Sequence, residues 1–557
     1  MKGFYLLLCL GVSLSSFAQL SPTDETFIDS LMNRQYPADL PGAVILVARD
    51  GKPVFRKAYG MADIELQVSN KPEYVFPLAS MSKQFTAVSI LQLVQEGKLS
   101  LKDNIRKYLP DYNAHSRIIS VENLLTHTSG IPGFDDNTDF SLSKEYQRDE
   151  LLGLFMNDSL LFEPGTNFAY TNSGYYLLAL IIEKASGSSY NDYLDEHIFK
   201  KIGMSHTSTG TNDFPVPGLV RGYSIGAGSK VANGEYFRWS TTMGAGSILT
   251  CLDDLLKWDE ALYDNSLVKQ ETLQKAFIPF KTSTGKLCNY GYGWAMARYE
   301  HILFLTHRGN EPGYTTAEMR LPSIHASVYI LSNNSSSSPG GLATKIALRL
   351  AKLRLPVPGP YKNSAADLKS YKGTYAIDRI GVRIAKSQCF VTVSNDSLFI
   401  QEPESERTLL LPLRKDHFCS SIRYGLYYHF IRNMKGEAVE MEVYNLPVNI
   451  GRISERMKLK TTTPDDMKFV SLPAEQLMKF TGKYDFGNDA FVTVGLKDSK
   501  LFVLFADQPA AEFFAENELR FIEKNTAVEY EFVADSKGDV NKVIFHGMLD
   551  HAGLRIK

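Results

Sequence analysis

Cysteine is scarce in this chain, with five among 557 residues. No two of them form a C-x-x-C pair, and neither an HExxH helix nor a calcium-loop pattern occurs, so the sequence indicates no metal and no cofactor. The thiols beyond the N-terminal segment permit disulfides without specifying them. A pairing of Cys389 with Cys419, which lie in the same C-terminal part, stays open.

An excess of charge of either sign is also absent, since 60 lysines and arginines stand against 62 aspartates and glutamates. With a net charge of -2, no basic excess indicates nucleic acid or an anionic membrane surface as a partner. The composition is typical of globular proteins. A length of 557 residues exceeds one ordinary core, so several domains are expected.

Long apolar runs are missing except at the N-terminus. There Lys2 precedes an apolar run over residues 4–14, and Ser16 and Ala18 are small residues of the kind that a signal peptidase recognises. This pattern predicts a signal peptide over residues 1–18 and a periplasmic or secreted protein. The run is too short to span a bilayer comfortably, and an uncleaved anchor is the alternative. Leu8 before Cys9 disfavours a lipoprotein.

The pattern after the signal peptide predicts an α/β domain over residues 19–355. Asp50-Gly51 between two β-rich runs, 43–47 and 54–58, predicts an antiparallel hairpin. Helical periodicity over residues 80–96 ends at Gly97. We expect the hairpin to share a sheet with late strands and the helices to lie between them in sequence. The other expected helices are 24–33, 121–125, 173–185, 253–263 and 343–352, and the expected late strands are 302–306 and 326–331.

The character of the chain changes near Pro356, where three prolines mark a linker over residues 356–366. Short alternating segments then replace helices, and they contain an internal repeat: residues 368–375 resemble 477–484, and residues 430–436 resemble 532–538. We therefore expect two small antiparallel β-barrel domains, 367–458 and 473–557, joined by a linker over 459–472. One larger β domain is the alternative.

Four Ser-x-x-Lys pairs occur in the chain, beginning at Ser80, Ser141, Ser266 and Ser283, so the spacing alone means little. Only Ser80 begins a long amphipathic helix. A serine and a lysine at i and i+3 share one helical face, and the N-terminal end of a helix favours developing negative charge. Ser80 with Lys83 as its base is therefore the favoured nucleophile, and a capping serine followed by a solvated lysine is the alternative.

A second candidate nucleophile is Ser224, in the G-x-S-x-G pattern of residues 222–226. Such an elbow needs a strand before the serine and a helix after it. Glycines and prolines surround this segment, so a glycine-rich loop is the better interpretation.

Five stretches in a fixed order resemble the penicillin-recognising serine hydrolases, which include class C β-lactamases, D-alanyl-D-alanine carboxypeptidases and D-aminopeptidases. The resemblance covers about residues 22–355, and the layout with two following barrels is closest to the D-aminopeptidase type. The stretches are Ser80-Met-Ser-Lys83, residues 124–132 with His127, Tyr170-Thr-Asn172, residues 290–294, and His307-Arg308-Gly309.

The resemblance implies a fold of the β-lactamase/transpeptidase type: an antiparallel sheet flanked by helices, with a helical subdomain and the site between them. It also implies that Ser80 attacks a carbonyl carbon and carries the acyl group, while Lys83 and Tyr170 exchange its protons. Asn172 would bind substrate, and the backbone N–H groups of Ser80 and Asn310, next to Gly309, would form the oxyanion hole. The resemblance leaves open which of Lys83 and Tyr170 is the base.

Position 307 narrows the expected substrate. Most β-lactamases and carboxypeptidases of the family carry a lysine there, a fixed cation suited to a carboxylate. His307 is mostly neutral above its pKa of about 6.5, so we expect a peptidase or amidase on small or D-amino-acid substrates. An esterase, a β-lactamase or carboxypeptidase, and a non-catalytic cell-wall or peptide-binding protein remain alternatives. Arg308 is either a ligand for a substrate carboxylate or a solvated strand residue, and His127 is expected to hold a turn.

Overall fold

The computed structural model describes residues 20–556 except for a set of short internal segments, so the predicted signal peptide lies outside the described residues. The segments not described are 114–115, 227–229, 286, 380–384, 402–406, 422–425, 446–454, 461–469, 486–490, 499, 506–510, 516, 524–527, 536–537 and 547–549. Within the described part, no helix is both long enough and apolar enough to pass through a bilayer.

A six-stranded antiparallel sheet forms the centre of the first domain, in the order β12-β13-β14-β15-β1-β2. The predicted hairpin is confirmed: Asp50 and Gly51 have φ values of 49° and 71°, as the tight turn between two twisted strands requires. The hairpin pairs with the last strand of the sheet, as expected. The strands are β1 (Ala43–Arg49), β2 (Lys52–Tyr59), β12 (Ala295–Tyr299), β13 (Ile302–Glu311), β14 (Tyr314–Leu321) and β15 (Ala326–Ser332).

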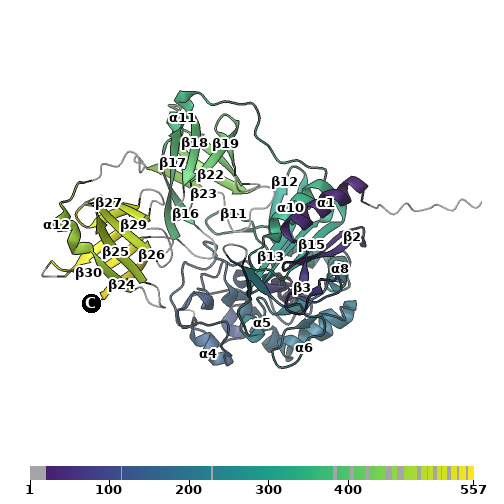
Figure 1. The fold of residues 1–557 in the computed structure, drawn as a ribbon. Helices are drawn as coiled ribbons and strands as arrows, with labels where there is room; N and C mark the ends of the chain where they lie inside the picture. Colours follow the sequence, from purple (N-terminus) through teal and green to yellow (C-terminus); the bar gives the residue numbers. More distant parts are fainter. Residues whose placement is uncertain are drawn as a thin grey trace, which may run out of the picture.

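Helices cover both faces of this sheet (Figure 1). Side chains alternate along each strand, so that Val328 and Ile330 face one layer while Tyr329 and Leu331 face the other. The first layer holds α1 (Pro22–Gln35) and α10 (Pro339–Leu350). The opposite layer holds α2 (Lys83–Gln95), α5 (Asn172–Ser186) and α8 (Leu252–Ala261). This confirms the expected fold class.

Shorter elements complete the domain and surround the site. The short helices are η1 (Ala79–Ser82), η2 (Ile105–Lys107), α3 (Val121–Leu125), η3 (Phe134–Asp136), α4 (Arg148–Gly153), α6 (Tyr190–Leu194), η4 (Asp195–Phe199), α7 (Lys200–Ile202), η6 (Trp239–Thr242), α9 (Gln270–Leu273), η7 (Gln274–Phe277) and η8 (Pro322–Ile324). The short strands are β3 (Met61–Asp63), β4 (Val68–Ser69), β5 (Phe76–Pro77), β6 (Ser208–Thr209), β7 (Tyr223–Ile225), β8 (Val231–Asn233), β9 (Ile248–Thr250), β10 (Phe280–Lys281) and β11 (Leu287–Cys288).

Two closed antiparallel barrels follow, which confirms the expected pair of β-barrels. The first closes where β16 pairs with β23, and the second where β24 pairs with β31. The first comprises α11 (Ala365–Tyr371), β16 (Gly373–Arg379), β17 (Ala385–Ser394), β18 (Ser397–Gln401), β19 (Thr408–Arg414), β20 (His417–Ser420), β21 (Leu426–Arg432), β22 (Ala438–Asn445) and β23 (Glu455–Lys460). The second comprises α12 (Ala474–Leu477), η9 (Met478–Phe480), β24 (Gly482–Asp485), β25 (Phe491–Lys497), β26 (Lys500–Phe505), β27 (Ala511–Ala515), β28 (Arg520–Glu523), β29 (Val528–Ala534), β30 (Val540–His546) and β31 (Asp550–Ile556).

The internal repeat reappears as matching contacts in the two barrels. The Tyr375 hydroxyl donates to the Tyr371 carbonyl at 2.8 Å, and the Tyr484 hydroxyl donates to the Phe480 carbonyl at the same distance. Each barrel also has a glycine turn with positive φ, at Gly436 and at Gly538. Equivalent tyrosines therefore stabilise the same connection, from the short helix into the first strand, in both barrels.

Cys389 and Cys419 do not form the disulfide that the sequence left open. Cys389 packs in the interior of the first barrel, whereas Cys419 carries a free thiol on the outside of the barrel wall. Alternate residues of a strand face opposite sides, and Phe418, the neighbour of Cys419, faces inward. The barrel wall thus separates the two sulfur atoms.

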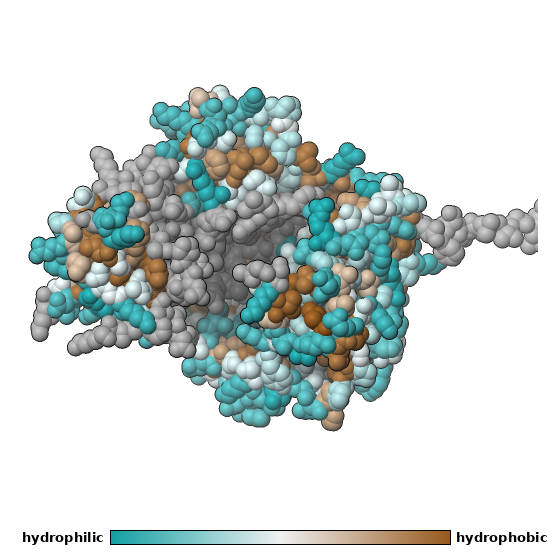
Figure 2. Space-filling view, in the orientation of Figure 1, coloured by the Kyte–Doolittle hydropathy of each residue, from teal (hydrophilic) through white to brown (hydrophobic). Residues whose placement is uncertain are grey.

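The outer face of the first barrel packs on the helix layer of α1 and α10. Cys419 and Tyr427 belong to the same buried cluster as Leu350 and Leu355, and the Tyr427 hydroxyl donates to the Pro356 carbonyl at 2.9 Å. In the face shown in Figure 2, hydrophilic residues predominate over both parts, with apolar residues gathered in separate patches. The barrel therefore covers apolar surface of the first domain.

We predict that Tyr427→Ala lowers the stability of the first domain, because it removes buried contact and one hydrogen bond at this interface. The expected loss is about 2–4 kcal/mol. The three tryptophans of the chain, Trp239, Trp258 and Trp294, all lie in the core of the first domain, so their fluorescence during denaturant unfolding reports that domain alone. Tyr361→Ala in the linker is the control. An unchanged midpoint for Tyr427→Ala would contradict the contact.

Candidate active site

Ser80 lies in a tight turn that leads into helix α2. The expected continuous helix over 80–96 is instead a 3-10 turn, η1, followed by α2, and Gly97 ends it with a φ of 70°. Ala79, directly before Ser80, has a φ of 49°, a strained conformation for a residue with a Cβ. Tertiary contacts hold this turn: Leu78 donates its N–H to the Ile248 carbonyl at 2.8 Å and accepts from the Thr316 hydroxyl at 2.9 Å.

Lys83 is fully buried and stands at the centre of the site. Its Nζ donates to Ser80 Oγ at 3.1 Å, to Asn172 Oδ1 at 2.8 Å and to the Ala245 carbonyl at 2.9 Å. Burial disfavours the charged form and lowers the pKa of Lys83 to about 7, against the opposing attraction of Asp135 and Glu311. An uncharged amine beside the serine hydroxyl can accept its proton.

Tyr170 and Asn172 reach Lys83 from the start of helix α5. The Tyr170 side chain hydrogen-bonds to Ser80, and burial raises the pKa of Tyr170, so its hydroxyl keeps its proton at neutral pH. The buried His127 holds this segment, since its Nδ1 accepts from the Thr171 N–H at 3.2 Å and its carbonyl accepts from the Ala169 N–H at 2.9 Å. His127 thus fixes the segment that carries both side chains.

His307 faces the same site from strand β13, in its neutral form. Its Nδ1 lies 2.7 Å from the Arg308 carbonyl, which only accepts, so Nδ1 carries the proton. Its Nε2 then accepts from the Tyr290 hydroxyl at 2.9 Å. Burial, together with the charge of Lys83, lowers the pKa of His307 to about 3. The site therefore has no fixed cation at this position.

The end of strand β13 presents an open edge. Its partner β12 pairs with it only as far as Thr306, and no other strand in the described part of the chain pairs with residues 307–311 on that side. Gly309 allows the strand to pass against the Ser80 turn, because a Cβ there would lie 2.3 Å from the Leu78 carbonyl oxygen. Backbone groups of Gly309 and Asn310 are thereby held beside the turn.

Of the two alternatives for Arg308, a ligand for substrate or a solvated strand residue, its position bears on the second, because its side chain is exposed and lies against helix α10. Its guanidinium lies against Gly340 of α10, where a Cβ would approach its Nε to 2.4 Å. Alternate residues of β13 face opposite layers, and Arg308 faces the layer of α10 whereas His307 faces that of α2. A substrate bound at Ser80 lies on the other side of the sheet.

A cleft of ≈ 660 Å³ opens above Ser80 and has three carboxyl groups in its lining, of which two, Asp135 and Glu311, lie close to matched stretches in the sequence and were still missed by sequence reasoning. Asp135 accepts from Asn172 Nδ2 at 3.2 Å, and Glu311 follows Asn310 in β13. Burial raises the pKa of Glu311 to about 8. Their nearness to the motif residues was the available signal, since each lies within a few positions of a matched stretch.

Ser224 lines the same cleft but is not a nucleophile elbow. The segment predicted as a glycine-rich loop is a short hairpin of β7 and β8, and among the residues described after Ser224 a strand, not a helix, comes next. Ser224 lacks the strand-to-helix turn that exposes and activates such a serine.

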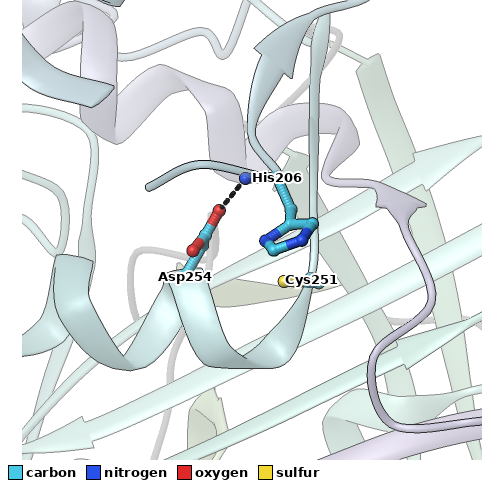
Figure 3. A group of neighbouring side chains, drawn as sticks. All are labelled: His206, Cys251 and Asp254. Carbon is cyan, nitrogen blue, oxygen red and sulfur yellow. Dashed lines mark hydrogen bonds between the residues drawn. The ribbon is translucent and has the colours of Figure 1, made fainter. Parts of the chain in front are cut away.

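A second cluster of polar side chains, His206, Cys251 and Asp254, includes none of the residues that line this cleft. Figure 3 shows these three side chains. The Asp254 carboxylate already accepts from the His206 N–H at 2.7 Å, from the Thr207 hydroxyl at 2.9 Å and from Lys257 Nζ at 2.8 Å. With a lysine ammonium neutralising the carboxylate, the cluster ties a loop to α8 and offers little to a metal ion.

Lys83→Met tests the burial of the amine through stability. In the folded protein the lysine binds its proton with a pKa of about 7, against about 10.5 in the unfolded chain. Between these values the unfolded state binds more protons, so the stability of the wild type rises with pH, by at most about 1.4 kcal/mol per pH unit. The variant lacks this slope.

Urea unfolding from pH 7 to about pH 9.5 measures the effect, with both proteins followed by tryptophan fluorescence. We expect the stability of the wild type relative to the variant to increase steadily across this window. Parallel curves would show that Lys83 keeps an ordinary pKa.

The first domain matches known proteins throughout its length. The family model "Beta-lactamase" matches residues 30–352, more than half of the 557 residues. Penicillin-binding protein 4* of Bacillus subtilis is 27% identical over 399 residues, which cover 67% of this chain and 86% of that protein.

Solved structures agree in fold. The D-amino acid amidase from Ochrobactrum anthropi SV3, complexed with L-phenylalanine, is 25% identical, with a TM-score of 0.51 over 60% of this chain and 98% of that one. The octameric penicillin-binding protein homologue from Pyrococcus abyssi has a TM-score of 0.54 over 78% of this chain and 99% of that one, and at 23% identity it shows the fold alone. With a serine and a buried lysine in contact in that fold, the chain is a serine hydrolase that belongs to the beta-lactamase family.

Proposed function

We propose that this hydrolase is an amidase or peptidase that acts through an acyl-enzyme on Ser80 and takes small or D-amino-acid substrates. The neutral state of His307 carries this proposal. A substrate carboxylate is best held by a fixed cation, and His307 is held uncharged by burial and by its bonds to Tyr290 and to the Arg308 carbonyl. The cleft is therefore poorly suited to a β-lactam or to a peptide with a free C-terminal carboxylate.

Lys83 is the base in the proposed mechanism and Tyr170 the proton donor. Uncharged Lys83 Nζ removes the proton of Ser80, and Ser80 Oγ attacks the carbonyl carbon to form a tetrahedral intermediate. The Tyr170 hydroxyl, hydrogen-bonded to Ser80, protonates the departing amine, and the proton on Lys83 restores the tyrosine. Water then attacks the acyl-enzyme by the same route in reverse, which releases the acid.

Backbone N–H groups of Ser80 and Asn310 stabilise the oxyanion in this mechanism. Gly309 keeps β13 close to the Ser80 turn, so that both groups stand on one side of the carbonyl. Loss of one such donor typically costs about 10²–10³ in rate. Asn172 anchors the lysine and binds the substrate amide.

The D-amino acid amidase from Ochrobactrum anthropi SV3 supports an amide substrate through its named activity and its complex with L-phenylalanine amide. An esterase of the same fold is the second candidate, because an ester makes fewer demands on the protonation of its leaving group. A non-catalytic binding protein is disfavoured by the intact contacts among Ser80, Lys83 and Asn172.

We also propose that the chain is exported, on the strength of the signal-peptide pattern over residues 1–18. N-terminal sequencing of the mature protein tests this. A chain that begins at Gln19 supports cleavage after Ala18, and a mature chain that retains Met1 contradicts it.

A substrate panel tests the proposed function: D-alanyl p-nitroanilide, a short p-nitrophenyl ester, nitrocefin and a peptide ending in D-Ala-D-Ala. We expect the wild type to favour the first two and His307→Lys to gain on the last two, by about tenfold or more, because it supplies a cation for their carboxylate. Ser80→Ala is the control and should lose all turnover. A wild type that prefers nitrocefin, or a His307→Lys variant that leaves the order unchanged, would refute the role of position 307.

A further inference from the structure

The ionisable side chains that line the cleft above Ser80 are all acidic among the described residues. Its lining residues include the carboxyl groups of Asp135, Glu235 and Glu311 and no lysine or arginine, among the residues that the structure describes. Only Lys83 lies beneath it, and burial favours its uncharged form. A ligand in this cleft therefore meets acidic side chains without a basic partner in the lining, and a bound cation would favour their charged form.

Glu311 is the most unusual of the three carboxyl groups. It is 9% exposed, and no group in the described part of the chain donates a hydrogen bond to its carboxyl oxygens. Room is made for it by Gly246, where a Cβ would lie 2.7 Å from Glu311 Oε1. Burial of a carboxylate without a donor is costly, so burial raises the pKa of Glu311 and favours its protonated form, and such a group is normally paired or bound to a ligand when it is charged.

Asp135 stands within electrostatic reach of Glu311 and repels it. The two groups enter the cleft from different elements, Asp135 from η3 and Glu311 from the end of β13. A cation placed between them favours the carboxylate form of both groups and supplies the hydrogen-bond donors that Glu311 lacks.

The direction of β13 decides which part of the substrate carries this cation. The strand passes Ser80 from His307, whose ring lies 6.2 Å from that of Tyr170, to Glu311 at its other end. Tyr170 protonates the leaving group in the proposed mechanism, so the leaving group departs on the His307 side. Glu311 therefore faces the acyl side.

We propose that Glu311, with Asp135, binds a primary ammonium on the acyl portion of the substrate and so restricts the enzyme to cationic acyl groups. This inference rests on the proposed function for its assignment of sides. Phe134, Phe140 and Leu142 line the same cleft and leave apolar room beside the ammonium. Amino-acyl substrates with a free amine fit this arrangement, and their N-acylated or hydroxy counterparts do not.

Binding to a Ser80→Ala background tests the proposal without turnover. Calorimetry compares D-alaninamide with D-lactamide, which has a hydroxyl in place of the ammonium. We expect the amine to bind about 10–100-fold more tightly. Adding Glu311→Gln should abolish this preference, whereas adding Glu518→Gln, an exposed position in the second barrel, should leave it intact. Equal affinity for the two ligands, or a preference that survives Glu311→Gln, would overturn the proposal.

Turnover separates this proposal from the proposed function. The wild type is given the p-nitroanilides of D-alanine and of D-lactic acid, and Glu311→Gln should lower kcat/KM only for the first. If the binding preference holds but neither compound is hydrolysed, the proposed function alone fails. If both compounds are hydrolysed at equal rates and bound with equal affinity, the ammonium site alone fails. Glu311→Asp keeps the charge and should retain part of the preference, which guards against a folding defect in Glu311→Gln.

Discussion

The burial of Lys83 is the constraint on which the site depends. A lysine amine in the core needs hydrogen-bond partners, and it finds them in three separate parts of the chain: Ser80 in η1, Asn172 at the start of α5 and the carbonyl of Ala245 before β9. These three segments converge on Lys83. The cost of burying the ammonium is also what brings the pKa of the lysine near neutrality. Fold and chemistry are thus coupled at one side chain.

The surroundings of Lys83 are arranged to keep other positive charge away. His127 and His307 are both buried, and burial together with the charge of Lys83 lowers the pKa of each. The opposing carboxyl groups, Asp135 and Glu311, favour the charged lysine, and a bound ammonium would cancel that influence. Substrate charge and the basicity of Lys83 are therefore linked: a cationic acyl group makes the lysine a more available base, whereas an anionic group has the opposite effect.

Local sequence patterns predicted most of the fold, because hydrophobic periodicity and turn residues act over short distances. Residues 121–125 form a helix with the expected bounds, and Asp50-Gly51 forms the expected turn. The 3-10 turn at Ala79 was not predictable, since its positive φ is imposed by packing against β9 and β14. The direction of the Arg308 side chain could not be predicted, because the predicted strand stopped at 306. Extending β13 to Glu311 puts 307 and 308 on opposite faces. A disulfide between Cys389 and Cys419 was considered because both residues lie in one domain. In the structure they lie on opposite sides of the barrel wall.

In the candidate site, too, short sequence motifs were predictable, whereas features that depend on contacts between distant segments were not. The order of the matched motifs predicted that five residues belong to one site, and the structure places them together: Ser80, Lys83, Tyr170, Asn172 and His307. Asp135 and Glu311 escaped notice because an acidic residue is ordinarily solvated, and only the folded chain shows that Glu311 is buried beside a lysine. The state of His307 likewise depends on Tyr290, which lies in another matched stretch.

The central claim, that an uncharged Lys83 activates Ser80 near neutral pH, is tested most directly by the rate at which a fluorophosphonate labels Ser80 as a function of pH. Mass spectrometry locates the adduct. The account predicts labelling on Ser80 with a rate that rises through a midpoint near pH 7 and then levels off, and no such rise in Lys83→Met. A midpoint near the ordinary lysine pKa of about 10.4, or an adduct on Ser224, would contradict it.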